Sequence, residues 1–176
     1  MFEYAVWVKE QPLMSAAIQF GILGTLGEIL SQLFRARKMG LSWSARQWIF
    51  KPLAWAVLGI VIKYGFCGMR GFAAALAVHH FVPDILATGL GGALLLSVLT
   101  NIFFGPQMMA FHRVEDNLIA GEWNWTGLNK AFGTLLWFWI PAHTLTFSLP
   151  PEYQIGLAAV WSVALGIILG WTSRKR

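Results

Sequence analysis

Long apolar stretches recur from one end of the chain to the other, and no other feature limits the possible folds as strongly. A helix needs roughly 20 predominantly apolar residues to cross a bilayer. Five segments approach or exceed that length: Pro12–Phe34, Gln47–Phe81, Asp84–His112, Leu128–Ser148 and Tyr153–Trp171. We therefore expect an all-α bundle of about five transmembrane helices that forms a single integral membrane domain over residues 1–176.

The composition excludes the other broad classes of protein. The chain is 57% hydrophobic and 12% charged, whereas a soluble domain has about 45–50% and about 25%. A single cysteine rules out a disulfide scaffold. The net charge of +5 comes mainly from residues 35–51 and 174–176, which flank apolar segments. Such positive flanks are typical of membrane spans, so we expect the lipid bilayer and no nucleic acid as a partner.

The positions of the basic segments also predict a topology. Five spans place the Arg35–Arg46 loop and the C-terminal tail on one side, which the positive-inside rule makes the inner side. The N-terminus then lies outside. The second segment, Gln47–Phe81, leaves two alternatives open. It is either one helix about 52 Å long that protrudes from the hydrocarbon, or two pieces that break near Gly65–Gly71.

Small residues form stripes that predict close helix packing. Gly21 and Gly24 share a narrow face of the first segment with Glu28 and Gln32. In the last segment, Gly166 and Gly170 form a GxxxG motif, which lets a second helix approach closely. The motif leaves open whether the partner is another helix of this chain or a second copy, so a homo-oligomer stays possible.

Ionisable groups at membrane depth cost roughly 2.5–3.5 kcal/mol each, so they find partners or line a polar route. We expect Glu28 to pair with Lys51 or Lys63 of the next segment. Such a pair either fixes the register of the helices or lines a pathway. Lys63 and Arg70 are seven residues apart and share a helix face. They make a cationic cavity if the helix is continuous and faces inward, whereas Arg70 is an interfacial anchor if the helix breaks.

Signals for catalysis are weak. The sequence has no HExxH, CxxC or paired-carboxylate spacing, so we expect no enzyme, no cofactor and no metal. Glu115, Asp116 and Glu122 are interpreted as a solvated connection. An enzyme would require at least two of four side chains to meet at one point. The four are Glu28, His79, His112 and His143.

Two runs in the first half of the chain resemble motifs of one family of membrane proteins. Gly21–Gln32 is similar to a G-x-L-x-x-L-G-D-x-x-x-Q run, with Glu28 where that run has aspartate. Gly65–Gly68 and Phe81–Pro83 are similar to a GFxGP…F-x-P spacing, with Met69 in place of the first proline.

Residues 139–161 carry the most specific likeness. They resemble a W-P-x-x-Q-x-x-N-F…V-P-x-x-Y-R…W signature, with His143 or Thr144 in place of the glutamine and Gln154 in place of the arginine. On these runs the chain is identified as a distant member of the Mpv-seventeen and twenty-two-kilodalton peroxisomal membrane protein family. The resemblance implies a small polytopic protein associated with pore-like passage of solutes, and no enzymatic reaction. The family is usually drawn with four spans, but the apolar run Trp137–Phe147 leads us to expect five.

We therefore expect a channel or permeability pathway for small polar solutes, with a non-conducting membrane scaffold as the alternative. Polar groups that replace the hydration of a solute would line it; the candidates are Glu28, Gln32, Lys63, Asn101 and His143. Pro106 and Pro141 are expected to bend their helices and to free carbonyl groups. The resemblance implies a mitochondrial inner or peroxisomal membrane if the chain is eukaryotic. A bacterial chain would lie in the cytoplasmic membrane.

Overall fold

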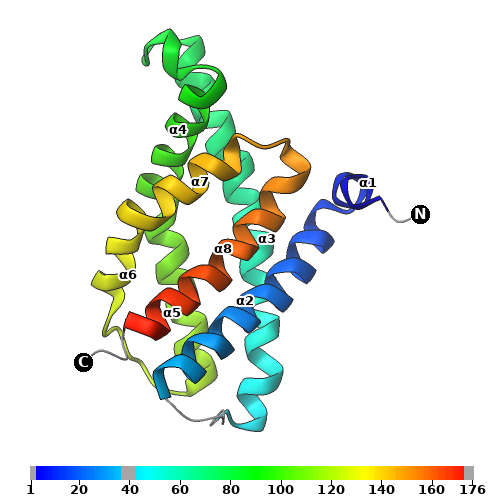
Figure 1. Ribbon diagram of the computed structural model, residues 1–176, viewed down its shortest axis with the longest axis vertical. Coiled ribbons are helices and arrows are strands. Elements are labelled where there is room, and N and C mark those ends of the chain that lie inside the picture. The colour runs from blue at the N-terminus through cyan, green and yellow to red at the C-terminus, as the bar shows by residue number, and fades with distance from the viewer. Residues whose placement is uncertain (1–2, 37–42, 173–176) are drawn as a thin grey trace.

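The computed structural model describes residues 3–36 and 43–172, and in this part of the chain every regular element is helical (Figure 1). This confirms the expected all-α bundle. The elements are α1 (Tyr4–Glu10), α2 (Pro12–Ala36), α3 (Ala45–Val78), the 3₁₀ turn η1 (Asp84–Leu86), α4 (Gly89–Leu99), the π-turn η2 (Thr100–Phe104), α5 (Gly105–Ala120), α6 (Leu128–Thr134), the π-turn η3 (Leu135–Trp139), α7 (Ile140–Phe147) and α8 (Pro151–Thr172).

Within the described residues, four helical runs are long and apolar enough to cross a membrane. They are Pro12–Arg35, Ala45–Val78, Gly89–Ala120 and Pro151–Trp171. The other expected segment is also helical, as α6, η3 and α7 in succession, and Figure 1 shows it beside α4 and α5. It is not one of the four runs, so a fifth span stays a prediction.

Helix α2 packs between α3 and α8, and its glycines explain the close approach on both sides. A Cβ on Gly21 would lie 3.4 Å from Ala56 of α3, and a Cβ on Gly24 would overlap the Trp55 ring. On the opposite side, a Cβ on Gly170 would lie 2.7 Å from the Ser31 carbonyl oxygen. Gly166 likewise rests on the α2 backbone at Gly27. The partner of the GxxxG motif is therefore α2 of the same chain.

Helix α3 is continuous over Ala45–Val78, which decides between the two alternatives for this segment. Ser44 begins it with a capping box, in which its side chain and that of Gln47 bond to each other's backbone N–H. At Gly65, where one of the two alternatives placed a break, the missing side chain makes room for the ring of Phe104. The helix ends three residues before Phe81, and its far end projects with α4 beyond α8 (Figure 1).

A π-turn precedes each of the two prolines that were expected to bend their helices. Pro106 is the second residue of α5, which follows η2, and Pro141 is the second residue of α7, which follows η3. Proline has no N–H to donate to the preceding turn, and π-turns commonly occur at functional positions within helices. The third segment also continues to Ala120 instead of ending at His112.

The apolar core lies where α2, α3, α4, α7 and α8 meet. Its largest members include Phe20, Leu58, Phe66, Phe147 and Ile155, all of them buried. The π-turns η2 and η3 lie beside this core, so the polar residues they carry are inside the bundle.

Candidate functional site

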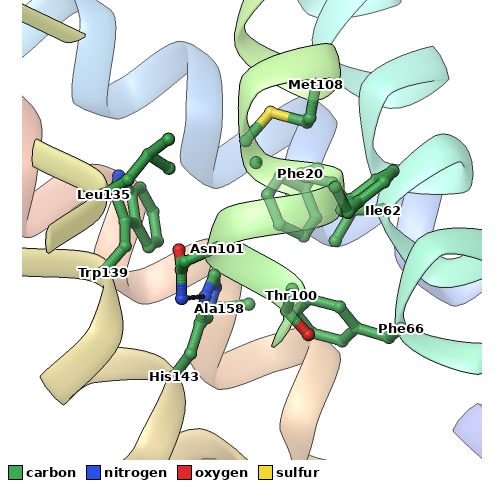
Figure 2. A pocket seen from close by; sticks show the side chains of 12 residues that line it. Phe20, Ile62, Phe66, Thr100, Asn101, Met108, Leu135, Trp139, His143 and Ala158 are labelled. Carbon is green, nitrogen blue, oxygen red and sulfur yellow. Dashed lines mark hydrogen bonds between the residues drawn. The ribbon is translucent and has the colours of Figure 1, made fainter. Parts of the chain in front are cut away.

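A buried hydrogen bond joins the two helices that contain π-turns. Asn101 of η2 places its amide nitrogen 3.1 Å from Nδ1 of His143 in α7, and the same nitrogen donates to the Ser97 carbonyl at 2.8 Å (Figure 2). Because the amide nitrogen is a donor, Nδ1 accepts, and a neutral His143 ring carries its proton on Nε2. A second bridge lies beside it, where the Ser97 hydroxyl donates to the Ile140 carbonyl at 2.7 Å.

Three buried polar atoms next to this bridge have no hydrogen-bond partner among the described residues: Thr100 Oγ1, Asn101 Oδ1 and Trp139 Nε1. Their side chains line one cavity of about 30 Å³, here named the central cavity. A water molecule needs about 10–15 Å³ of such space, so the cavity is large enough for a water-sized polar molecule. Burying a polar group without a partner is costly. The surface that this cavity exposes is nevertheless apolar, so the three atoms lie behind its walls and would meet a polar guest only if the walls moved.

A second cavity of about 180 Å³, here named the inner cavity, adjoins the central cavity. The two share Phe20, Ile62, Met108 and Trp139 as walls. The inner cavity is mainly apolar, but His112, Arg113 and Asp116 of α5 also line it. It therefore links the middle of the bundle with the polar end of α5.

Two further pockets continue in the opposite direction. The outer pocket, of about 230 Å³, shares Phe66 with the central cavity and is lined by Lys63, Phe66, Cys67, Arg70, Pro151, Gln154 and Ile155. A pocket of about 270 Å³ between α3 and α4 shares Arg70 with it. Neighbouring cavities thus have walls in common along the bundle, although they do not merge into one open tunnel.

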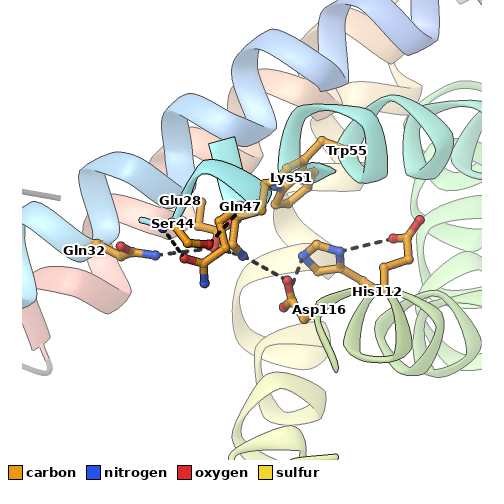
Figure 3. Close-up of polar contacts among 9 residues, drawn as sticks. Glu28, Gln32, Ser44, Gln47, Lys51, Trp55, His112 and Asp116 are labelled. Carbon is orange, nitrogen blue, oxygen red and sulfur yellow. Dashed lines mark hydrogen bonds and ion pairs between the residues drawn. The ribbon is translucent and has the colours of Figure 1, made fainter. Parts of the chain in front are cut away.

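Of the two lysines expected to pair with Glu28, the structure pairs it with Lys51. This buried lysine contacts Glu28 Oε1 and also lies 3.1 Å from Asp116 Oδ1 (Figure 3). Trp55 Nε1 donates to the second Glu28 oxygen at 3.3 Å, and Gln32 Nε2 donates to the first at 3.5 Å. The pairing is confirmed for Lys51, whereas Lys63 forms no part of this cluster.

The interpretation of Glu115 and Asp116 as part of a solvated loop is wrong. Both lie in the last turns of α5, and Asp116 faces Lys51. His112, one turn earlier, lies 3.4 Å from Glu115 and 4.0 Å from Asp116. Only Glu122 follows the helix, after the left-handed Gly121. Spacings of three and four residues from His112 were the signal for this shared helix face.

The remaining candidates divide between the cavities and the charged cluster. Asn101 and His143 line the central cavity, and Lys63 lines the outer pocket. Glu28 and Gln32 line none of these cavities and belong to the charged cluster instead. The expectation that Lys63 counters the charge of Glu28 is therefore wrong, because Lys51 does so.

Helix α1 lies outside the candidate spans and is bonded to α8 and α2. Lys9 lies 2.6 Å from Glu152 at the start of α8, and this hydrogen bond raises the pKa of the Lys9 ammonium group. Tyr4 donates to Gln19 of α2 at 2.7 Å, and burial raises the pKa of its phenol.

Across residues 3–36 and 43–172, no three His, Cys, Asp or Glu side chains are arranged to hold a metal ion. Glu28 and His143 belong to two different clusters, and His112 contacts two carboxylates of its own helix and the Trp55 ring. Compared with known proteins, the chain matches no family model, no curated protein and no solved structure.

Proposed function

We propose that this protein is a membrane permeability pathway for small polar solutes, which pass along the interior of the helix bundle. The observation that carries the proposal is the row of cavities with common walls, from the inner cavity through the central cavity to the outer pocket. Each stage offers polar groups: Asp116 and His112 in the first, Asn101 and Thr100 in the second, and Lys63 in the third.

The central cavity is the narrow point of this route. Its volume of about 30 Å³ accommodates a water-sized molecule, and apolar side chains such as Phe20 and Ile62 separate it from the inner cavity. The surface of the central cavity is apolar. Once its walls move, the unpartnered hydroxyl, amide and indole groups behind them would replace part of the hydration shell of a passing solute. Passage of anything larger than water requires these walls to move.

The two π-turns are the proposed moving parts. Each interrupts the regular helical hydrogen-bond pattern next to a proline, and both line the central cavity through Thr100, Asn101 and Trp139. A shift of η2 relative to η3 breaks the Asn101–His143 bond and widens the narrow point. We therefore place the gate at this hydrogen bond.

The resemblance to the Mpv-seventeen family supports the same proposal, since that family is associated with pore-like passage and with no enzymatic reaction. The alternative is a scaffold that recruits a partner through the GxxxG motif. This motif no longer supports the alternative. Gly166 and Gly170 already pack against Gly27 and Ser31 of the same chain. If the chain is eukaryotic, we place it in a mitochondrial inner or peroxisomal membrane.

A liposome assay tests the proposal. Vesicles that contain the purified protein are loaded with glycerol, glucose or sucrose, and the efflux of each is compared with that from protein-free vesicles. We expect a faster efflux that falls as the solute grows, and a slower efflux for Asn101→Leu than for the control Ile102→Leu, whose side chain is exposed. Wild-type efflux equal to that of protein-free vesicles would remove the proposal.

A further inference from the structure

We propose that the outer pocket binds anionic groups, namely carboxylate or phosphate, and thereby favours anionic solutes at that mouth of the pathway. The first half of this proposal concerns binding alone, whereas the second half rests on the proposed function. The pocket of about 230 Å³ lies between α3 and the first turn of α8.

Two cations face this pocket from α3. Lys63 and Arg70 are separated by two helical turns, about 10 Å along the axis, and both line the pocket. The ion pairs found among the described residues include neither of them. Lys63 is half-buried and Arg70 is exposed. A partly buried cation that lacks a directly bonded counter-charge favours an anionic guest.

The remaining polar groups in the pocket suit an anion as well. Arg70 donates one N–H to Gln154 at 2.6 Å, which orients the guanidinium while its other N–H groups stay directed elsewhere. Pro151 and Gln154 belong to the first turn of α8, a helix of 22 residues. The amino-terminal end of such a helix carries a partial positive charge and attracts anions.

The nearest carboxylate offsets this charge only in part, although it attracts Lys63 through space. Glu152, next to the pocket residue Pro151, forms an ion pair with Lys9 at 2.6 Å. That pair is neutral as a whole, so Lys63 and Arg70 leave the pocket with a local charge of about +2. The charged cluster at the opposite end of α3 has two carboxylates and one lysine, which gives the bundle an electrostatic asymmetry along its length.

Cys67 provides a direct measurement, because it lines the outer pocket, is exposed and is the only cysteine of the chain. The rate of its reaction with a negatively charged methanethiosulfonate is divided by the rate with a positively charged one. The thiolate fraction is the same in both rates and cancels, so the ratio reports the local electrostatic potential. A cationic pocket raises this ratio roughly fivefold above that of a small free thiol.

Variants identify the source of the potential. Lys63→Gln and Arg70→Gln should each lower the ratio by about twofold or more. The control is Lys130→Gln, which removes an exposed cation that does not line the pocket. This control should leave the ratio unchanged. A ratio equal to that of the free thiol, or a ratio that neither pocket variant changes, overturns the proposal. Because this measurement involves no flux, it can succeed even where the liposome efflux assay fails.

Protection experiments distinguish a soluble anion from a lipid headgroup. Inorganic phosphate is added to protein in phosphatidylcholine vesicles, and in a second arm the vesicles contain phosphatidylglycerol without added phosphate. Slower modification of Cys67 by phosphate supports the full proposal. Slower modification only in the phosphatidylglycerol vesicles supports an anion site that a headgroup occupies and overturns the preference for anionic solutes. The absence of protection in both arms overturns anion binding.

Discussion

The Asn101 amide nitrogen and His143 Nδ1 lie 3.1 Å apart and connect two helices, each with a π-turn that ends two positions before a proline. The bond thus joins the two irregular places in the bundle to each other. It lies in the wall of the central cavity, where a small shift of either turn changes the width of the proposed pathway. This relationship is the reason for placing a gate there.

The first prediction concerns the energy of this bond. Asn101→Leu and His143→Leu should each lower the free energy of unfolding by about 1–2 kcal/mol, because each leaves a buried polar group without its partner. The double variant should lose less than the sum of the two. Reversible unfolding in detergent micelles measures all three, and strictly additive losses would show that the two side chains are not coupled.

The second prediction concerns Lys51. Lys51→Met removes the one cation between Glu28 and Asp116 and leaves two carboxylates facing each other, so we expect a loss of about 3–5 kcal/mol. Glu28→Gln alone should cost less, and the combination of Glu28→Gln with Lys51→Met should recover part of the loss.

Lys9→Met is the matched control for Lys51→Met, since it breaks an ion pair whose lysine is 65% exposed. It should change the unfolding midpoint far less than Lys51→Met does, because water replaces the lost partner. Equal effects of the two lysine variants would contradict the buried role of Lys51.

Much of the fold follows from local patterns along the chain. The glycine stripe of α2 identified the face on which Glu28 meets α3, and the depth of Glu28 predicted a lysine partner. Lys51 fulfils this prediction and Lys63 does not, since the two lie twelve residues apart, about 18 Å along the helix. The spacing alone left both candidates open, because it does not fix how far α3 is shifted along α2.

Other features depend on contacts between distant segments, which no local pattern reveals. Nothing near Asn101 in the sequence identifies His143 as its partner, because the bond exists only where η2 and α7 pack together. Gly65 left a break in α3 open as one alternative, but its missing side chain accommodates Phe104 in a continuous helix. Asp116 was assigned to a loop because polar residues follow α5, whereas a lysine of α3 holds it inside the bundle.

The third prediction tests the crossing of α2 and α8. Gly166→Ala places a methyl group against the backbone of Gly27, and we expect a loss of about 1–3 kcal/mol from overpacking. Gly71→Ala in α3 meets nothing within 4 Å and should leave stability unchanged or raise it slightly. The two melting temperatures in the same detergent provide the comparison, and a stable Gly166→Ala variant would argue against the close approach.

The fourth prediction concerns the number of spans. If the helix made of α6, η3 and α7 crosses the membrane, the two ends of the chain lie on opposite faces. A protease-cleavable tag at each end, tested in sealed vesicles, should then give one accessible and one protected terminus. Two termini with the same accessibility indicate four spans, which leaves α6–α7 inside or beside the bundle without crossing.

The most direct test of the account is to fill the central cavity and measure the efflux of glycerol from liposomes. Ala158 of α8 is 1% exposed and lines that cavity, whereas Val160 of the same helix is 47% exposed and lies outside it. We predict that Ala158→Leu reduces efflux to that of protein-free vesicles, while Val160→Leu conducts like the wild type. Wild-type efflux from a folded Ala158→Leu protein would contradict a pathway through the bundle.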